Sequence, residues 1–354
     1  MISSDRIVFL SNWFDNPYKK SLTSCLQKRG FTVSDYLWKY FFLPQVITPQ
    51  IPDIVHLHTL HPFLIGKNFI SRGLKLVLFI SQVFILNLLG GKVIWTVHEW
   101  KNKLKPNDNI TPFQGRVIGY FFHGIITHCE TTKQEIIQAF SLKNTSKVVV
   151  IPHGNYVDWY ENKVSKEEAR EKLGIGLNKN VFALFGNIYR YKGVLEAIDS
   201  FLKLPPEQAF LIIAGKVESQ ELEAEIKAKI AGCENILFLS QRIPDEEVQI
   251  YLNAADWVVF PYKVFTTSGV AILAMSFSCA CIAPKVGFFQ DVLDEYGAIL
   301  YESSDEEGLR QAMESALVKS HEVESMGKYN FQLVKKWSWD YVTDETLKVY
   351  KSSF

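Results

Sequence analysis

Residues 260–277, FPYKVFTTSGVAILAMSF, indicate the fold more clearly than any other part of the chain. The apolar run from Trp257 to Phe260 predicts a buried strand, and a polar turn then leads directly into an apolar helix, Val270 to Phe277. The first N–H groups of such a helix have no partner within it, and the helix dipole makes that end positive. The segment predicts a cradle for a phosphate or diphosphate. An ordinary N-capped helix of an α/β protein explains the same residues equally well.

The turn and the start of this helix supply the candidate donor-binding groups. The hydroxyls can donate hydrogen bonds to an anion, and the glycine lacks a side chain that would keep a ligand away. These candidates are Thr266, Thr267, Ser268, Gly269 and Val270.

A second candidate loop lies upstream, in residues 181–193, VFALFGNIYRYKG. A buried strand ends at Gly186, a loop with Arg190 and Lys192 follows, and a helix is expected over Val194–Leu202. Two cations at the carboxyl end of a strand suit an anion bound at the edge of an open sheet. Solvated loop cations are the simpler alternative. The loop lacks the Gly-Lys-Ser/Thr run of a P-loop.

The two loops, together with Ile212-Ile-Ala-Gly-Lys216, resemble the nucleotide-sugar-binding half of GT-B glycosyltransferases, in particular glycosyltransferase family four. The resemblance places Lys192 at the lysine of the family motif and Asn187 at its arginine. It implies that Arg190 supplies the missing cation. The donor-binding residues implied in these loops are Gly186, Asn187, Arg190, Lys192, Gly215 and Lys216.

The chain departs from the family at two glutamates, whose positions hold Phe265 and Leu273. Its Thr-Ser-Gly turn is similar to a divergent branch that includes bacterial β-mannosyltransferases of exopolysaccharide assembly. The resemblance implies a metal-independent transferase without a cofactor that uses GDP-mannose or a UDP-sugar. The implied acceptor is a lipid-linked saccharide of polysaccharide or glycolipid assembly. Because an apolar Phe265 cannot orient sugar hydroxyls as a carboxylate does, we expect transfer with inversion.

Strand and helix patterns alternate along the whole chain, which favours parallel α/β sheets. Between two runs of such patterns, a helix is expected over Lys166–Leu173, with a capping box formed by Ser165 and Glu168. The expected strands are Ile7–Leu10, Ile54–His58, Lys92–Val97, Gly124–His128, Lys147–Ile151, Phe182–Phe185, Ala209–Ala214, Ile236–Leu239, Trp257–Phe260 and Cys281–Ala283. The resemblance implies the GT-B fold, with two Rossmann-like parallel-sheet domains facing a central cleft. We expect an acceptor-side domain over residues 1–160 and a nucleotide-sugar-binding domain over 161–336. The helix at 337–354 is expected to pack back on the first domain.

In the first domain the strand Lys92–Val97 brings His98 and Glu99 to its carboxyl end. The resemblance places His98 against the donor sugar. Glu99 and Asp15 are the candidate bases for an acceptor hydroxyl. A structural histidine and solvent-exposed loop carboxylates remain the alternatives.

The candidate acceptor-binding residues are Asn16 and Tyr18, which follow the first expected strand, and His58, which ends the second, Ile54–His58. His56, His58 and His61 are close in sequence, but no Asp or Glu cluster accompanies them, so no metal site is predicted.

Composition restricts the possible partners. The 354 residues are 47% apolar with a formal net charge of zero, which argues against bulk nucleic-acid binding. Residues 1–110 hold thirteen Lys/Arg and six Asp/Glu, a net of +7, which suits an anionic lipid surface. Five cysteines without Cys-x-x-Cys spacing indicate free thiols. With no signal peptide visible, we expect a cytoplasmic protein, with peripheral membrane association left open.

The apolar run Leu74–Leu89 is shorter than a bilayer span and contains Lys75, Gln82 and Asn87. It is interpreted as a buried helix, with an interfacial helix as the alternative. Two other functions remain open, a nucleotide-sugar epimerase of the same fold and a non-catalytic scaffold. A Rossmann dehydrogenase is disfavoured because no Gly-x-Gly-x-x-Gly follows the first strand.

Overall fold

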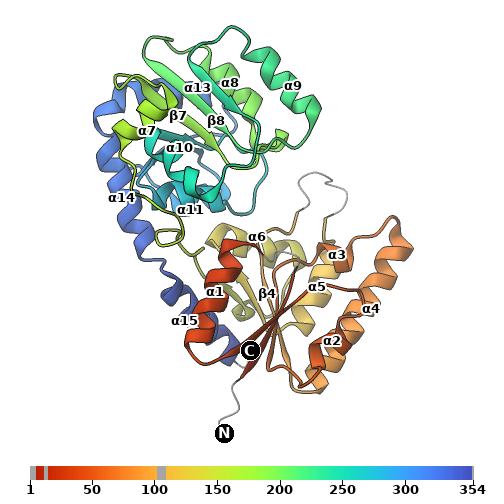
Figure 1. Cartoon of the computed structure of the whole chain (residues 1–354). Helices are drawn as coiled ribbons and strands as arrows, with labels where there is room; N and C mark the ends of the chain where they lie inside the picture. The colour runs from red at the N-terminus through yellow and green to blue at the C-terminus, as the bar shows by residue number, and fades with distance from the viewer. Residues whose placement is uncertain (1–4, 12–14, 102–108, 353–354) are drawn as a thin grey trace. The chain divides into compact units, whose positions relative to one another are not determined.

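The structure is a computed structural model, and it describes residues 5–11, 15–101 and 109–352. The chain forms two compact units (Figure 1). Unit 1 comprises Met1–Gly154 and Trp337–Phe354, and unit 2 comprises Asn155–Lys336. The chain therefore leaves unit 1 once and returns to it with its last helix.

Unit 1 is built on a six-stranded parallel sheet in the order β2-β1-β3-β4-β5-β6. Its strands are β1 Arg6–Leu10, β2 Thr32–Tyr36, β3 Ile54–Leu57, β4 Lys92–Thr96, β5 Gly124–Thr127 and β6 Val148–Val150. From β1 the chain first adds a strand on one side and then continues on the other. The loops after β1 and β3 therefore lie at the switch point, where open α/β sheets bind ligands.

Helices cover both faces of this sheet, and β1 shows why. Successive side chains of a strand point to opposite faces. Ile7 and Phe9 accordingly join one hydrophobic cluster, and Val8 and Leu10 join the other. The helices of unit 1 are α1 Pro17–Lys28, α2 Leu43–Ile47, α3 His61–Leu64, α4 Phe69–Leu88, α5 Pro112–Phe121, α6 Glu130–Phe140 and α15 Trp339–Lys351.

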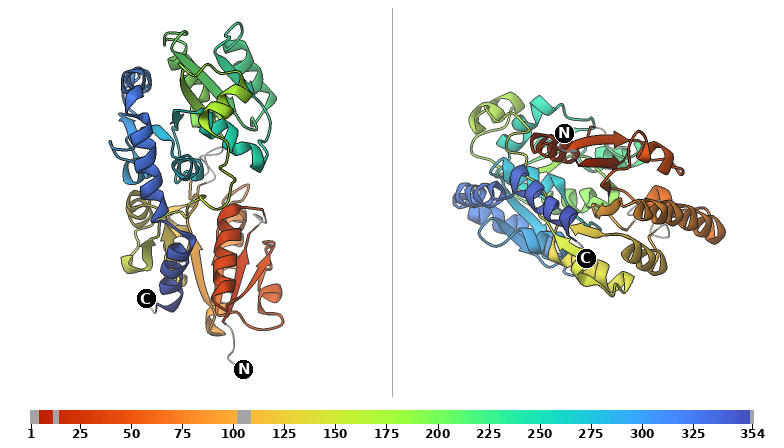
Figure 2. Two further views of the ribbon diagram at one scale, coloured as in Figure 1. Left: turned by 60° about the vertical axis from the view of Figure 1, so that its left-hand side comes forward. Right: turned by 90° about the horizontal axis from the view of Figure 1, so that it is seen from below.

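The last helix, α15, closes the face of the sheet that also carries α1 (Figure 2). Val342 and Val349 of α15 are buried in the cluster that contains Ile7 and Phe9. At the sheet, the hydroxyl of Tyr350 lies 2.6 Å from Nδ1 of His56. The carboxyl-terminal helix is therefore part of the core of unit 1.

Unit 2 repeats the architecture with the strand order β12-β11-β10-β7-β8-β9, again wholly parallel. Its strands are β7 Asn180–Phe185, β8 Ala209–Ala214, β9 Ile236–Leu239, β10 Trp257–Val259, β11 Ala280–Pro284 and β12 Ala298–Tyr301. The chain reverses direction across the sheet between β7 and β10, which are neighbours. The loops after these two strands form the switch point of unit 2.

The helices of unit 2 are α7 Lys166–Leu173, α8 Val194–Phe201, α9 Gln220–Lys229, α10 Val248–Ala254, α11 Gly269–Ser276, α12 Gly287–Val292, α13 Gly308–Val318 and α14 Val323–Lys335. Within the described residues, short 3₁₀ segments lie at Thr145–Lys147 in unit 1 and at Arg190–Lys192, Asp245–Glu247 and Lys319–His321 in unit 2. A buried ion pair between Arg170 and Asp256, 2.6 Å between Nη2 and Oδ2, joins α7 to the start of β10. Asp256 thereby has a structural role.

The expected α/β pattern is confirmed for most elements. The capping box at the start of α7 is present, because the Ser165 hydroxyl accepts from the Glu168 N–H at 3.2 Å and the Glu168 carboxylate accepts from the Ser165 N–H at 2.8 Å. Two strands, β2 and β12, were missed. None of the five cysteines, all of which lie in the described part of the chain, forms a disulfide, and four of them are buried.

The apolar run near residue 80 forms a longer helix than expected, α4. Leu76, Phe79, Val83 and Leu86 pack into the core of unit 1. The opposite face, which includes Leu74, is exposed. The interpretation as a buried helix therefore holds for one face only.

Candidate functional site

Three loops at the carboxyl edge of the second sheet touch one another through glycines. Gly186 follows β7 with φ +88°, and a Cβ there would lie 3.0 Å from Cγ2 of Val270 in α11. A Cβ on Gly215, after β8, would lie 1.9 Å from the Gly186 carbonyl oxygen. At Gly193, φ +71°, it would lie 2.0 Å from the carbonyl oxygen of Pro261. The loops after β7, β8 and β10 are therefore in direct backbone contact.

The start of α11 has the form expected for a cradle. Ser268 caps the helix, and its hydroxyl accepts from the Ala271 N–H at 3.2 Å. Thr266 and Ser268 are buried. The buried Thr267 hydroxyl has no hydrogen-bond partner among the described residues. A polar group in this state gains from a ligand that accepts its proton.

Lys192 is the cation that the structure brings to this cradle. Its Nζ donates to the carbonyl oxygen of Asn187 at 2.7 Å and lies 5.3 Å from the ring centroid of Tyr262. Tyr262 is buried beside the turn, and its side chain hydrogen-bonds Ser268. Burial lowers the pKa of Lys192 to about 8. The desolvated ammonium lines a void of about 20 Å³ with Asn187 and Tyr262, and an anion would stabilise its charge.

Arg190 lies elsewhere. Its guanidinium makes a two-point ion pair with Glu225 of α9, with Nη1–Oε2 and Nη2–Oε1 distances of 2.9 and 2.5 Å. The pair raises the pKa of Arg190 and is half exposed. To bind the donor as the resemblance implies, the Arg190 guanidinium would have to break its ion pair with Glu225. Lys216 is also exposed, and its carbonyl oxygen accepts from the Ile188 N–H at 2.9 Å.

We expect Lys192→Ala to weaken binding of a free nucleoside diphosphate by about 1.5–3 kcal/mol, the scale of a charge-assisted hydrogen bond. The affinity of the unaltered protein should also fall as pH rises through about 8, where the free ammonium loses its proton. Arg190→Ala is the matched control and should cost less than about 1 kcal/mol, since its pair with Glu225 is exposed. Calorimetric titration with UDP and GDP measures both. Unchanged affinity in Lys192→Ala would remove this residue from the donor site.

A cluster of histidines occupies the carboxyl edge of the first sheet. His58, His98, His128 and His153 follow β3, β4, β5 and β6 in turn. Their ring centroids lie 5.8, 4.8, 5.4 and 5.0 Å from that of Tyr18. The rings of His58 and His98 are also joined, with 3.1 Å between Nδ1 and Nε2.

Burial makes these imidazoles neutral. It lowers the pKa of His153 to about 3 and that of His128 to about 4. Burial, and then the neighbouring imidazoles, hold the pKa values of His58 and His98 well below the usual range. Nε2 of His58 and of His128 is buried without a hydrogen-bond partner among the described residues. Neutral rings can exchange hydrogen bonds with uncharged sugar hydroxyls.

The other acceptor-side candidates take different positions. The carboxylate of Asp15 is 89% exposed and lies 3.0 Å from Nζ of Lys20. Glu99 is half-buried directly after His98. Asn16 caps α1, and its Oδ1 accepts from the Tyr18 N–H at 2.9 Å. Tyr18 itself is buried and hydrogen-bonds Thr96.

His128 belongs to this histidine cluster but was not among the residues predicted for the site. It directly follows β5, as His58 follows β3, and this shared position could have identified it. Among the described residues, no group of three or more His, Cys, Asp or Glu side chains is arranged to hold a metal ion.

Phe265 and Leu273, which stand where the family motif has glutamates, both lie in apolar surroundings. Phe265 is half-buried and packs on Phe289, with 4.7 Å between ring centroids. Leu273 is buried within α11. Neither position offers a hydrogen bond to a sugar.

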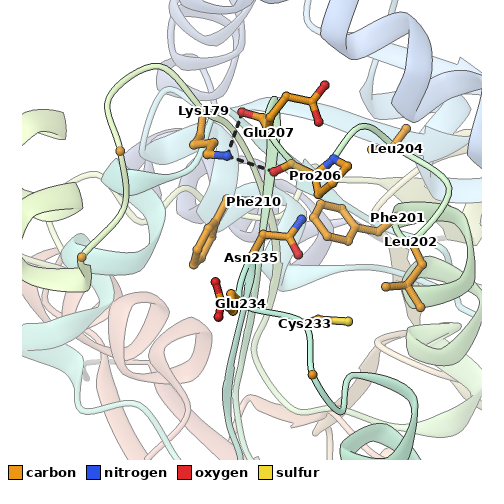
Figure 3. Close-up of a pocket in the computed structure, with 13 residues that line it drawn as sticks. Lys179, Phe201, Leu202, Leu204, Pro206, Glu207, Phe210, Cys233, Glu234 and Asn235 are labelled. Atoms are coloured by element: carbon orange, nitrogen blue, oxygen red, sulfur yellow. Dashed lines mark hydrogen bonds between the residues drawn. The ribbon is translucent and has the colours of Figure 1, made fainter.

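A larger hollow of about 690 Å³ lies at the opposite edge of the second sheet (Figure 3). Lys179 and Asn235, which line it, immediately precede β7 and β9. Nζ of Lys179 donates to the carbonyl oxygens of Pro206 and Glu207 at 2.9 and 2.7 Å. Because ligands of open α/β sheets bind at the carboxyl edge, this hollow is not the donor site.

Comparison with known proteins agrees with this geometry. Residues 165–333 match the family model of group 1 glycosyl transferases. The chain is 21% identical to the alpha-maltose-1-phosphate synthase of Mycolicibacterium smegmatis over 62% of its own length and 60% of that relative. It is 24% identical to the GDP-mannose:glycolipid 4-beta-D-mannosyltransferase of Xanthomonas campestris over 84% of the chain and 79% of that enzyme.

The fold is shared with solved structures that include glycosyltransferases. Anabaena HepE, determined in complex with UDP and glucose, superposes with a TM-score of 0.75 at 16% identity, covering 99% of this chain and all of that one. The GT-B fold predicted from the sequence is confirmed. The match to the first relative spans less than two thirds of that protein.

Proposed function

We propose that this chain, which has the GT-B fold and matches the group 1 glycosyl transferases over residues 165–333, transfers a sugar from a nucleotide diphosphate donor to a saccharide acceptor. One observation carries the proposal: Gly186, Lys192 and the start of α11 converge at the switch point between β7 and β10. This arrangement supplies a glycine, a desolvated cation and helix N–H groups to one anion.

Similarity to relatives suggests the substrates. The Xanthomonas relative is named for GDP-mannose and a glycolipid, and HepE was solved with UDP. We propose GDP-mannose or a UDP-sugar as donor and a lipid-linked saccharide as acceptor, within polysaccharide or glycolipid assembly. The proposed location is the cytoplasm, with peripheral association at the cytoplasmic face of the membrane.

The proposed reaction is a single displacement. The acceptor hydroxyl oxygen forms a bond to the anomeric carbon while the bond from that carbon to the diphosphate oxygen breaks. The diphosphate leaves with the electron pair, and Lys192 with the N–H groups of α11 stabilises its charge. The hydroxyl proton passes to a carboxylate of unit 1, either Glu99 or Asp15. Neutral His98 would hydrogen-bond the donor sugar.

Thermal-shift screening against GDP, UDP and their sugars tests donor binding first, because a ligand of the folded state raises the melting temperature. Slow hydrolysis of the bound donor without acceptor would support a transferase. Conversion to an epimer would instead establish the epimerase. Absence of both binding and hydrolysis would leave the non-catalytic scaffold.

We expect the first-formed product to have a β-linkage when the donor is α-linked. Phe265 gives the donor sugar no carboxylate, so a base on the acceptor hydroxyl is needed instead. Proton NMR of the anomeric signal reads the outcome directly, and an α-signal contradicts inversion. Glu99→Gln and Asp15→Asn identify the base. A β-product formed at full rate in both variants would exclude Glu99 and Asp15 as the base.

Transfer should continue in the presence of EDTA. Lys192 and the start of α11 are proposed to stabilise the leaving diphosphate without a divalent cation. Product formation is compared with and without the chelator, and after adding Mn²⁺ back. Loss of transfer with EDTA and its recovery with Mn²⁺ would contradict this mechanism.

A further inference from the structure

We infer that the outer face of α4, together with the exposed face of α5, is a docking surface for an anionic lipid bilayer. The inference extends the proposed lipid-linked acceptor by naming the surface that meets the membrane. The proposed lipid-linked acceptor explains why the protein would bind a bilayer. Binding to the bilayer itself can be tested without donor or acceptor.

The first observation is a row of exposed apolar side chains on α4, which lies at the outer edge of unit 1 (Figure 1). Ile70, Leu74, Val77, Phe84 and Leu88 are all exposed and recur at helical spacing. Single exposed apolar side chains are ordinary, but five of them along one face of a 20-residue helix, with only the polar Ser81 between Val77 and Phe84, mark an interaction surface.

The neighbouring helix extends this surface. Asn87 of α4 donates to the carbonyl oxygen of Phe121 at 2.9 Å, so α5 lies against α4. Phe113, Arg116 and Tyr120 of α5 are exposed and share one face at helical spacing. The bilayer-docking surface is thus formed by two adjacent helices.

The helix must lie on the bilayer and not cross it. Its length and composition would allow a span, and it is the one helix in the described part of the chain that meets this test. Leu76, Phe79 and Val83, however, belong to the core of unit 1. Gln82 of the same face donates to the carbonyl oxygen of Tyr40 at 2.7 Å and accepts from the Leu43 N–H at 3.1 Å. Crossing a membrane would break this packing.

Charge complementarity selects an anionic bilayer as the occupant. Residues 61–91, which include α4, contain three Lys/Arg and no Asp or Glu. Lys67 is exposed just before α4, and Arg116 is exposed on α5. A hollow of about 850 Å³ between the starts of the two helices is lined by Phe69, Leu76 and Phe113 with Lys67 and Arg72. Apolar walls with basic residues beside them suit lipid chains below anionic headgroups.

Sedimentation of the full chain with vesicles tests the inference. We compare vesicles of phosphatidylcholine alone with vesicles in which about a third of the lipid is phosphatidylglycerol. The unaltered protein should bind the anionic vesicles more tightly. Leu74→Ser with Val77→Ser should weaken that binding at least about tenfold, because both side chains enter the interface.

Two further variants make the result specific. Leu177→Ser with Val318→Ser is the matched control, since its side chains are 64% and 76% exposed in unit 2, against 67% and 68% for Leu74 and Val77. It should bind as the unaltered protein does. Lys67→Gln with Arg116→Gln should lower binding to anionic vesicles about tenfold and leave binding to neutral vesicles unchanged.

Three results would overturn the inference. They are failure of the unaltered protein to bind either vesicle, equal binding by the α4 variant, and a dimer in sedimentation velocity that Leu74→Ser with Val77→Ser converts to a monomer. The last result would assign the surface to a second copy of the chain. A thermal shift with nucleotide on the same samples shows separately whether the proposed donor site is intact.

Discussion

Unit 1 should lose stability steeply between pH 7 and pH 5, while unit 2 does not. Burial lowers the pKa of His56 and His153 to about 3 and that of His128 to about 4, and it holds those of His58 and His98 well below the usual range. In the unfolded chain these groups bind protons near pH 6.5. The unfolded state therefore binds more protons as pH falls below 6.5, which favours unfolding.

Between pH 7 and pH 5, each imidazole with a folded-state pKa of 3 to 4 lowers the free energy of unfolding by about 2 kcal/mol. Two of them would already remove about 4 kcal/mol, a large part of the stability of an ordinary domain. The one histidine of unit 2, His321, has an exposed side chain. The two units should therefore respond differently to the same acid.

Hydrogen exchange at both pH values measures this difference. Amides of β4 should lose protection at pH 5, and those of β8 should keep it. His56→Gln should reduce the pH dependence of unit 1, whereas His321→Gln should leave it unchanged. Equal protection of β4 at both pH values would mean that the cluster accepts protons without unfolding.

Gly193→Ala should be among the most damaging single substitutions in unit 2. A Cβ there would lie 2.0 Å from the Pro261 carbonyl oxygen, and a backbone atom cannot move aside as a side chain can. Together with the positive φ, we expect a loss of about 2–4 kcal/mol in the free energy of unfolding. Because the loops after β7 and β10 would separate, binding of UDP or GDP should weaken as well.

Gly174→Ala is the matched control. Its φ of +68° is close to the +71° of Gly193, but a Cβ there would meet nothing within 4 Å. It should cost only the backbone strain, about 1–2 kcal/mol, and leave nucleotide binding unchanged. Urea unfolding of the two variants isolates the contact with Pro261. Equal losses of unfolding free energy in Gly193→Ala and Gly174→Ala would show that the contact with Pro261 adds no penalty.

The sequence was sufficient to predict the second sheet except for β12, and the loops that follow β7 and β10. Gly186 and the turn before Val270 each end a strongly apolar strand, and the carboxyl ends of parallel strands meet at one edge. The capping box at Ser165 and Glu168 was readable because both partners lie within one helical turn.

Features that depend on distant residues could not be predicted. β2, TVSDY, is an edge strand with exposed Thr32 and Asp35, so it lacks the apolar signal of a central strand. The pairing of Arg190 with Glu225 joins residues 35 positions apart in sequence. The histidine cluster depends on β3, β4, β5 and β6 being neighbours in the sheet, an order that no local pattern records.

The return of α15 to unit 1 imposes an order on biosynthesis. The face of the first sheet that carries Ile7 and Phe9 is completed only by Val342, Val349 and Tyr350. The ribosome must make all of Asn155–Lys336 before these residues emerge, a delay of roughly ten to forty seconds at ordinary rates. Unit 2 is contiguous and can fold during this interval. Unit 1 is therefore translated first but completes its folding after unit 2. Its uncovered apolar face needs protection from aggregation during this interval.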